Sequence, residues 1–324
     1  MIQENNSKSS IKNSTFIPPH PLNTAVLFLV FNRLDTTKQV FEAIRQAKPP
    51  RLYVAADGDR ETREDEAEKV KAVREYIMQN IDWECEVKTL FREHNLGCKM
   101  AVSGAIDWFF KNEEMGVILE DDCLPSQSFF WFCEELLERY KDDMRIGQIS
   151  GFNPLVEYDT FEDSYLYSKF GPIWGWASWR RVWKVYDVKM TSWPKVRDTQ
   201  IINYITDSSI EKEWRLELFE KLYSNKIDTW DYQWSYAKLI NSYMSIIPSK
   251  NMIKNIGFGD DATHTIGKIK DELLKTFELQ IVTHPKLVVR NKDFDIKYLS
   301  NFVKLKKINS LIQQLKHQIK RFKR

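Results

Sequence analysis

The chain has 324 residues and a formal net charge of only +2, with 43% hydrophobic and 29% charged residues. A chain of this length can bury a sizeable core, and its small net charge argues against a nucleic-acid partner. The longest apolar run, residues 25–31, is too short to span a bilayer.

The first residues and the cysteines indicate a cytoplasmic protein. Residues 1–13 are polar and lack the apolar stretch of a secretory signal. The four cysteines have no Cys-x-x-Cys spacing, so a reducing compartment suits them better than a zinc site or a disulfide framework. Residues 1–21, rich in Ser and Asn and ending in prolines, are predicted to form a disordered N-terminal segment.

Strands and helices alternate between residues 22 and 151. Apolar runs predict buried strands, and amphipathic stretches between them predict helices. This alternation predicts an α/β fold with a mostly parallel sheet and helices on both faces. The predicted strands cover residues 25–31, 51–56, 85–90, 117–119 and 146–150, and the predicted helices cover residues 36–47, 63–79, 99–110 and 126–140.

Polar side chains follow three of these strands at the point where each strand ends. The carboxyl ends of parallel strands meet at one edge of a sheet, where open α/β sheets bind their ligands, so these side chains are expected to lie together. They are Asn32 and Arg33 after the first strand, Asp57 after the second, and Glu120, Asp121 and Asp122 after the fourth.

Three consecutive acids at the end of a buried strand repel one another, so a positive group is expected among them. Mg²⁺ or Mn²⁺, which take oxygen ligands, would join these acids to phosphate oxygens. The alternative is a solvated acidic turn that caps the helix predicted from residue 126. The chain contains neither Gly-x-Gly-x-x-Gly nor a P-loop motif, so those two modes of nucleotide binding are not expected.

The alternation stops after residue 151, and residues 152–297 are predicted to form a second half of the chain with a different organisation. Most of the 11 tryptophans lie there, and their flat faces suit sugar recognition as well as core packing. A helix is predicted over residues 211–223 and a strand over residues 244–247. Residues 255–264, rich in Gly and acids, are expected to form a loop near the site.

Taken together, these residues give the chain a resemblance to the GT-A nucleotide-sugar glycosyltransferases. The chain resembles most the inverting N-acetylglucosaminyltransferase of N-glycan branching and bacterial nucleotide-diphospho-sugar transferases of similar layout. The likeness covers residues 25–265 and implies a Rossmann-like GT-A fold in which residues 22–151 bind the nucleotide sugar. It rests on Val-Ile-Leu-Glu-Asp-Asp at residues 117–122, on Asn32-Arg33, on Asp57, and on Trp230-Asp231 followed by Trp234.

The resemblance implies a role for each strand-end residue. The last acid of the family motif binds Mn²⁺, which assigns the metal to Asp122, and the two acids before it contact the sugar nucleotide. The arginine after the first strand approaches the phosphates, and the acid after the second strand accepts the uracil N–H. The donor-binding residues would therefore be Asn32, Arg33, Asp57, Glu120 and Asp121.

The resemblance makes residues 152–297 the acceptor-binding and catalytic half. The family carries its catalytic base in a Trp-Asp-Asp-Trp segment, where this chain has one acid in place of two, and the base would be Asp231. Trp176 is expected to contact substrate, and His264, which lies in an acidic loop, is expected to reach the metal or the phosphates. Structural alternatives remain open: Arg33 paired with Asp35, Asp57 in an Asp-Gly turn, Asp231 as a helix N-cap, Trp176 in the core, and His264 in a structural role.

The resemblance implies a metal-dependent, inverting glycosyltransferase that uses Mn²⁺ or Mg²⁺. Its donor would be a nucleotide-diphosphate sugar, with UDP favoured by Asp57, and its acceptor a glycan or lipid-linked hydroxyl. One alternative is a sugar nucleotidyltransferase, although residues 32–35 lack the Gly-rich loop which that class uses after its first strand. Another is a non-catalytic, membrane-attached interaction protein on a degenerate GT-A fold.

The predicted C-terminal segment, residues 298–324, resembles a basic amphipathic helix. Residues 304–324 contain eight Lys or Arg and no acid, and six apolar side chains repeat at helical spacing. Such a helix is typical of docking on an anionic membrane surface, which would place the protein on the inner face of the plasma membrane. The alternative is a helix that packs on the catalytic domain or on another protein.

Overall fold

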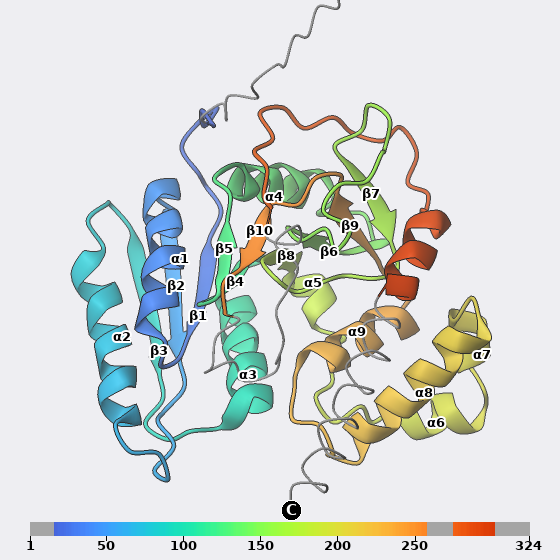
Figure 1. The fold of residues 1–324 in the computed structure, drawn as a ribbon, viewed down its shortest axis with the longest axis horizontal. Helices are drawn as coiled ribbons and strands as arrows, with labels where there is room; N and C mark the ends of the chain where they lie inside the picture. Colours follow the sequence, from blue (N-terminus) through green and yellow to red (C-terminus); the bar gives the residue numbers. More distant parts are fainter. Residues whose placement is uncertain (1–15, 258–274, 302–324) are drawn as a thin grey trace, which may run out of the picture.

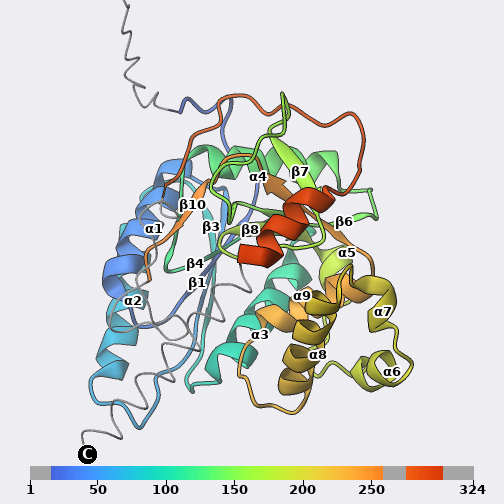
Figure 2. The same cartoon turned by 45° about the vertical axis from the view of Figure 1, so that its right-hand side comes forward.

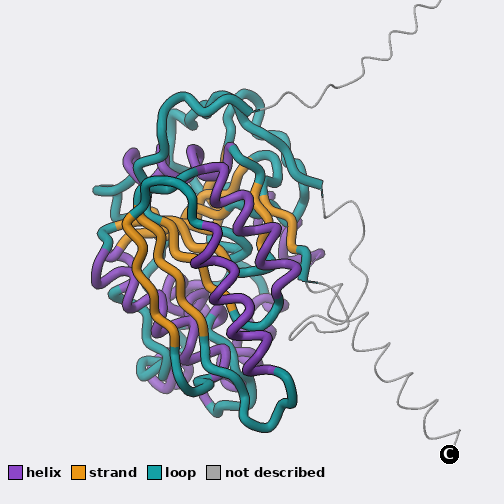
Figure 3. The backbone as a smooth tube through the Cα atoms, turned by 90° about the vertical axis from the view of Figure 1, so that its left-hand side faces the viewer, coloured by secondary structure: helices purple, strands orange, loops and turns teal. Residues whose placement is uncertain are grey.

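An eight-stranded sheet runs through the centre of the computed structural model, which describes residues 16–257 and 275–301. The strand order is β3-β2-β1-β4-β8-β6-β9-β7 (Figure 1). Helices lie on both sides of the strands (Figure 3). The predicted α/β class, with a mostly parallel sheet in a Rossmann-like, GT-A-like layout, is confirmed.

The strands of this sheet are β1 (Val26–Val30), β2 (Arg51–Ala56), β3 (Glu86–Phe91), β4 (Met115–Glu120), β6 (Ile146–Ser150), β7 (Tyr165–Ser168), β8 (Trp176–Trp179) and β9 (Met244–Pro248). The short strands β5 (Cys123–Pro125) and β10 (Ile253–Asn255) form a separate antiparallel pair.

The helices are α1 (Leu34–Ala47), α2 (Glu66–Asn80), α3 (Gly97–Asn112), α4 (Ser128–Arg139), α5 (Arg180–Trp183), α6 (Trp193–Asp198), α7 (Ile202–Ile205), α8 (Ser209–Tyr223) and α9 (Asp231–Ile240). Residues 292–301 are also helical.

The first four parallel strands place a topological switch at the middle of the sheet. From β1 the chain passes outward through β2 to β3, and α1 and α2 pack side by side along this path. The chain then returns through α3, on the other side of the sheet, to β4, which pairs with the free edge of β1 (Figure 2). Open α/β sheets bind ligands at such a point, outside the carboxyl ends of the strands.

Two strands of the large sheet, β7 and β8, and both strands of the separate pair arise where the sequence predicted none. β8 pairs antiparallel with β4 and with β6, so it lies between these two predicted strands. β7 pairs antiparallel with β9 at the edge of the sheet. All four residues of β8 are buried, so this strand lacks the apolar-polar alternation that marks a half-exposed strand. The predicted boundary near residue 151 therefore falls between strands of one continuous sheet.

The predicted disordered segment, residues 1–21, extends too far along the chain. The ring of Phe16 packs on Trp131 with 5.3 Å between ring centroids, and the indole N–H of Trp131 donates to the carbonyl of His20 at 2.8 Å. These contacts attach residues 16–21 to α4. Residues 1–15 lie outside the described part of the chain.

The C-terminal predictions are only partly covered by the described residues. The predicted tail was expected to begin at residue 298, but residue 298 lies inside a helix that already runs from residue 292. The rings of Tyr298 and Phe170 lie 4.8 Å apart, which holds this helix against the end of β7. The basic stretch of residues 304–324 lies outside the described residues. Over residues 16–257 and 275–301, no helix is long and apolar enough to cross a membrane.

Tryptophan packing joins α9 to the sheet. The ring of Trp176 in β8 lies 5.8 Å from Trp230 and 5.7 Å from Trp234, and all three side chains are buried. Trp183 lies 5.0 Å from Trp234. We call these four residues the indole cluster. Aromatic pairs at such distances contribute packing energy beyond the area that they bury, so the cluster holds the start of α9 against β8.

A buried lysine lies beside the indole cluster. Lys238 of α9 donates to the side-chain oxygens of Gln148 and, at 3.3 Å, Ser245, and its ammonium lies 5.3 Å from the ring centroid of Trp234. No carboxylate of a described residue forms an ion pair with it. Burial, aided by the charge of Arg215, lowers the pKa of Lys238 to about 7.

We expect Lys238→Met to change how stability depends on pH. The unfolded chain holds the lysine proton up to about pH 10.5, whereas the folded protein releases it near pH 7. The penalty on the folded state is therefore complete below about pH 7 and is relieved as the pH rises toward 10.5. In that window the wild type should gain up to about 1.4 kcal/mol of unfolding free energy per pH unit relative to the variant.

Urea titrations at several pH values between 6 and 10 measure this difference. Lys195→Met, at an exposed position of α6, is the matched control and should follow the wild type. Equal pH slopes for the wild type and Lys238→Met would show that the buried ammonium is not neutral in the folded protein.

Candidate active site

The candidate site lies at the carboxyl ends of β1 and β4. These strands pair in parallel with Leu29 opposite Glu120, so the residues that follow them emerge at the same edge of the sheet. α1 begins at Leu34, two residues earlier than predicted, with Arg33 in the N-cap position. The Arg33 side chain makes no capping hydrogen bond to this helix, so its guanidinium can contact other residues.

Arg33 contacts the two acids that follow β4. Its Nη2 donates to Asp121 Oδ1 and, at 2.9 Å, to Asp122 Oδ2. Burial alone would lower the pKa of Arg33, but the two carboxylates raise it above its ordinary value, so the guanidinium remains charged. The alternative partner for Arg33, Asp35, forms no ion pair with it in the described structure.

Of the three acids of the motif, Glu120 has the fewest hydrogen bonds to described residues. Its Oε1 is buried and accepts no hydrogen bond from a described residue. Burial raises the pKa of Glu120 well above its usual range, and the charges of Asp122, Asp121 and Asp231 add to this shift. Burial also raises the pKa of Asp121, although the guanidinium opposes the change. One arginine therefore compensates only part of the charge that three carboxylates would carry.

These residues fit a hard divalent cation chemically. Carboxylate oxygens are preferred ligands of Mn²⁺ and Mg²⁺, and a cation would satisfy the buried oxygen of Glu120 and offset the remaining negative charge. Among residues 16–257 and 275–301, no three His, Cys, Asp or Glu side chains are arranged as a complete ligand set. Asp122 would therefore hold a metal only with ligands from a substrate or from other residues, and the predicted contributor His264 lies outside the described residues.

The short β5–β10 ribbon closes one side of the motif. Asn255 pairs with Cys123, and the backbone N–H of Ile256 donates to the carbonyl of Asp122 at 2.8 Å. A Cβ on Gly257 would lie 2.3 Å from Asp122 Oδ2 and 2.8 Å from Arg33 Nη1, so only glycine fits there. Residues 255–257, which begin the loop predicted over residues 255–264, therefore lie directly beside the acids.

Asp57 caps the beginning of α3. Its carboxylate accepts the backbone N–H groups of Leu96 at 3.0 Å and Gly97 at 3.1 Å. A Cβ on Gly58 would lie 2.4 Å from the backbone carbon of His94, so the two loops meet only because residue 58 is glycine. Burial raises the pKa of Asp57 even though these amides favour the charged form. Contact with a nucleobase remains a prediction for this carboxylate.

Cys98 lies where the separate acids of the site converge. Burial raises the pKa of its thiol to about 12, and four neighbouring carboxylates act in the same direction, so the thiol is neutral at physiological pH. Those carboxylates belong to Glu120, Asp231, Asp228 and Asp57. Residues from β2, β4 and the segment before α9 therefore surround the first turn of α3.

Asp231 faces this region from the second half of the chain. It is the first residue of α9, after Trp230 in the N-cap position, so it does not occupy the N-cap itself. The hydroxyl of Thr229 donates to its Oδ1. Asp231 is also one of the charges that raise the pKa of Glu120, so its carboxylate is close enough to interact electrostatically with the β4 acids.

Two residues that were predicted to contact substrate, Trp176 and Asn32, make contacts within the protein. Trp176 is wholly buried in the indole cluster, so its ring offers no exposed face to a substrate and the structure places it in the core. Asn32 donates to Glu66 Oε1 at 2.9 Å. Glu66 also accepts from Arg60, which lowers the pKa of this glutamate to about 2. Asn32 therefore helps to attach β1 to the start of α2.

Sequence reasoning missed four residues that shape the site: Cys98, Asp228, Gly257 and Glu66. Cys98 was considered only as a possible metal ligand or disulfide partner. Its position directly after Gly97, just before the helix predicted over residues 99–110, was a signal that was not used. Asp228 precedes the predicted base by three residues and would have been found by treating each acid of that segment as a candidate. No local signal distinguishes Gly257 or Glu66, because their contacts join segments that are distant in sequence.

No family of known proteins and no curated protein matches this chain. Solved structures match half of it at low similarity. A mannosyltransferase from Pyrobaculum calidifontis in complex with GDP-Man and Mn²⁺ matches 50% of this chain and 46% of its own, with 13% identity and a TM-score of 0.34. HddC from Yersinia pseudotuberculosis matches 50% of this chain and 80% of its own, with 11% identity and a TM-score of 0.29.

A UDP-glucose pyrophosphorylase complexed with UDP-glucose matches 51% of this chain and 79% of its own, with 10% identity and a TM-score of 0.29. The chain thus covers less than half of the mannosyltransferase. Two of these three structures, the mannosyltransferase and the pyrophosphorylase, contain a nucleotide sugar. At such low TM-scores the similarities concern the fold and carry no argument about activity.

We expect Glu120→Gln to stabilise the protein when no divalent cation or nucleotide is present. The wild-type carboxyl group holds its proton more tightly in the folded state than in the unfolded state, where its pKa is near 4.5. Wild-type stability should therefore fall as the pH rises above that value, whereas glutamine has no charge to bury. The Tm of the variant should exceed that of the wild type by several degrees at pH 8 and by less at pH 5.

Thermal unfolding with a chelator present measures both proteins. Glu114→Gln, at an exposed position just before β4, is the matched control and should leave Tm unchanged at either pH. A loss of stability in Glu120→Gln at pH 8 would mean that the buried carboxylate has a favourable partner in the folded protein.

Proposed function

We propose that this protein is a metal-dependent, inverting glycosyltransferase. It would transfer a hexosyl or N-acetylhexosaminyl group from a nucleotide-diphosphate donor, with UDP favoured, to a hydroxyl of a glycan or lipid-linked acceptor. The observation that carries the proposal is the acid-rich end of β4, held beside Arg33 at the switch point, with Asp231 of the other half of the chain close enough to raise the pKa of Glu120.

The leaving group explains the need for both positive charge and carboxylates. As the bond between the sugar and the diphosphate breaks, the departing nucleoside diphosphate takes both electrons and gains negative charge. Arg33 would stabilise that charge, and its ion pairs with Asp121 and Asp122 orient its guanidinium before substrate binds. Mn²⁺ or Mg²⁺, when bound through Asp122 and the diphosphate, would neutralise further charge on the same group.

Inversion requires a base on the face of the sugar opposite the diphosphate. Asp231 would accept the proton of the acceptor hydroxyl while that oxygen forms its bond to the anomeric carbon. The Thr229 hydroxyl donates to Oδ1, which would orient the carboxylate. Because Asp231 comes from α9, it can approach from the acceptor side while the diphosphate rests at the sheet.

The proposal also includes the nucleobase of the donor, the acceptor and a membrane surface, as expected from the sequence. Asp57 at the end of β2 lies on the donor side, where a uracil N–H would reach its carboxylate. A lipid-linked acceptor would agree with membrane docking through residues 304–324. The proposed location is the cytoplasm, with peripheral attachment to an anionic surface.

Asp122→Asn should abolish the metal-dependent part of nucleotide binding without unfolding the protein. The amide keeps the size of the side chain but loses the charge that attracts a divalent cation. The measurement is the thermal shift produced by UDP, GDP and their sugar derivatives, each with and without Mn²⁺. Asp35→Asn, an exposed acid on α1, should retain the wild-type shift. A metal-dependent shift that survives in Asp122→Asn would place the metal elsewhere.

Asp231→Asn should preserve donor binding and reduce transfer by about 10²–10⁴-fold, the usual contribution of general acid–base catalysis. The Thr229 hydroxyl can still donate to the asparagine oxygen, so the local structure should persist. Transfer is measured by release of the nucleoside diphosphate in the presence of acceptor. Asp228→Asn, an exposed acid three residues earlier, tests the neighbouring candidate and should remain active. The opposite pattern would move the base to Asp228.

A further inference from the structure

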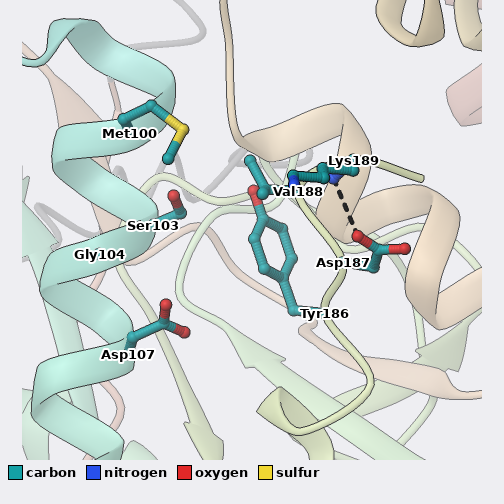
Figure 4. A pocket seen from close by; sticks show the side chains of 8 residues that line it. All are labelled: Met100, Ser103, Gly104, Asp107, Tyr186, Asp187, Val188 and Lys189. Carbon is teal, nitrogen blue, oxygen red and sulfur yellow. Dashed lines mark hydrogen bonds between the residues drawn. The ribbon is translucent and has the colours of Figure 1, made fainter. Parts of the chain in front are cut away.

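A pocket of about 280 Å³ lies between α3 and the segment that follows α5 (Figure 4). On one side it is lined by a stripe of α3 that includes Met100, Ser103 and Asp107, spaced so that they share one face of the helix. On the other side lie Tyr186 and Lys189. The pocket contains none of the predicted donor-binding residues.

One end of this pocket adjoins the proposed catalytic base. The Tyr186 hydroxyl donates to the backbone carbonyl of Trp230 at 3.3 Å, and Trp230 immediately precedes Asp231. Asp231 is also one of the charges that raise the pKa of Tyr186. Because a helix rises 1.5 Å per residue, the stripe of α3 extends roughly 10 Å from Met100 to Asp107. The pocket thus runs along α3 beside the contact between Tyr186 and Trp230.

The lining of the pocket suits hydroxyl groups. Asp107 Oδ1 accepts the indole N–H of Trp183 at 2.7 Å, while its other oxygen accepts no hydrogen bond from a described residue. Ser103 donates to the carbonyl of Lys99 at 2.6 Å, so its oxygen can still accept a hydrogen bond. The Tyr186 hydroxyl already donates to the Trp230 carbonyl, so its oxygen can act only as an acceptor, whereas the ammonium of Lys189 is a donor at the pocket wall. Both kinds of hydrogen bond are therefore available to a ligand.

The aromatic wall of the pocket is rigid. The Tyr186 ring stacks on Trp183 with 4.3 Å between centroids and an interplanar angle of 11°. Trp183 in turn belongs to the indole cluster, so the wall is continuous with the core that holds α9. A fixed ring beside hydrogen-bonding groups favours a ligand that has both apolar C–H faces and hydroxyl groups.

The charge of the pocket disfavours an anionic ligand. Asp187 is satisfied within the protein, because it accepts the backbone N–H groups of Lys189 and Thr191 and the Thr191 hydroxyl. With Asp107 it contributes two carboxylates, against the single ammonium of Lys189. A carboxylate or phosphate would meet net repulsion here, whereas a neutral ligand would not.

We propose that this pocket binds a neutral sugar residue of the acceptor, which rests on the proposed transferase function and locates its acceptor subsite. Its volume, near the lower limit of about 300 Å³ for ligand pockets, suits one sugar residue rather than a longer glycan. The sugar would lie against Tyr186 with a hydroxyl on the open oxygen of Asp107. Its reacting hydroxyl would extend past the Tyr186–Trp230 contact toward Asp231.

Saturation-transfer NMR on the full chain tests the pocket without relying on turnover. The probes are p-nitrophenyl glycosides of neutral hexoses and N-acetylhexosamines, with a uronic acid glycoside as the charged counterpart, each measured with and without UDP and Mg²⁺. We expect at least one neutral glycoside to bind and the uronide to bind more weakly. Failure of every neutral glycoside would overturn the inference.

Two variants locate the binding. Asp107→Asn retains an acceptor for the Trp183 indole but loses the carboxylate charge, so glycoside affinity should fall about tenfold. Met100→Trp, on a side chain that is 47% exposed, should obstruct the pocket and abolish binding. Lys111→Trp adds the same bulk at an exposed position further along α3 and should bind like the wild type. Unchanged binding in the first two variants, with folding verified by Tm, would also overturn the inference.

Nucleotide binding distinguishes this inference from the function on which it rests. The pocket variants should retain the wild-type thermal shift with nucleotide sugars, because their substitutions lie outside the donor site. If nucleotide sugars bind but neutral glycosides do not, the acceptor subsite is wrong and the transferase proposal stands. If glycosides bind in the pocket but no nucleotide sugar binds, the carbohydrate site stands and the transferase proposal fails.

Discussion

The antiparallel pairing of β8 with β4 is the constraint on which the candidate site depends. Ile118 pairs with Trp176, only two residues before the first acid of the motif. Trp176 in turn packs on Trp230, the residue before Asp231. The strand that ends in the acids and the helix that begins with the proposed base are therefore joined through two contacts. Because buried aromatic packing resists displacement, the separation of these groups is set by the core rather than by a surface loop.

The same arrangement concentrates negative charge at one edge of the sheet. Glu120, Asp121 and Asp122 are consecutive residues, and the charge of Asp231 adds to theirs from the second half of the chain. Arg33 is the cation that directly contacts the motif among the described residues. Burying carboxylates without full compensation destabilises the folded protein, so the fold retains an energetic cost that a bound cation would remove. This cost supports a binding role for the motif, because a purely structural turn gains nothing from it.

Much of the α/β half could be predicted because its signals are local. Apolar runs identified β1, β2 and β4, and the meeting of parallel strand ends brought Arg33 to the acids as expected. The second half was harder to predict. β8 consists of buried aromatic and small residues with no alternation, and its paired residues lie 26 to 64 positions earlier in the chain. Its place between β4 and β6 depends on which strand edges the rest of the sheet leaves open.

The sequence by itself determined the fold class, the acids at the end of β4 and the edge of the sheet at which they emerge, because strand periodicity and chain direction specify these features locally. Only the tertiary structure decided that Asp57 caps α3, that Asn32 is held by Glu66, and that Trp176 belongs to the core. It also decided that Asp231 lies close enough to interact electrostatically with Glu120, although more than a hundred residues separate them in the chain. Each of these outcomes depends on contacts between segments that are far apart in sequence, and these contacts form only when the complete core packs.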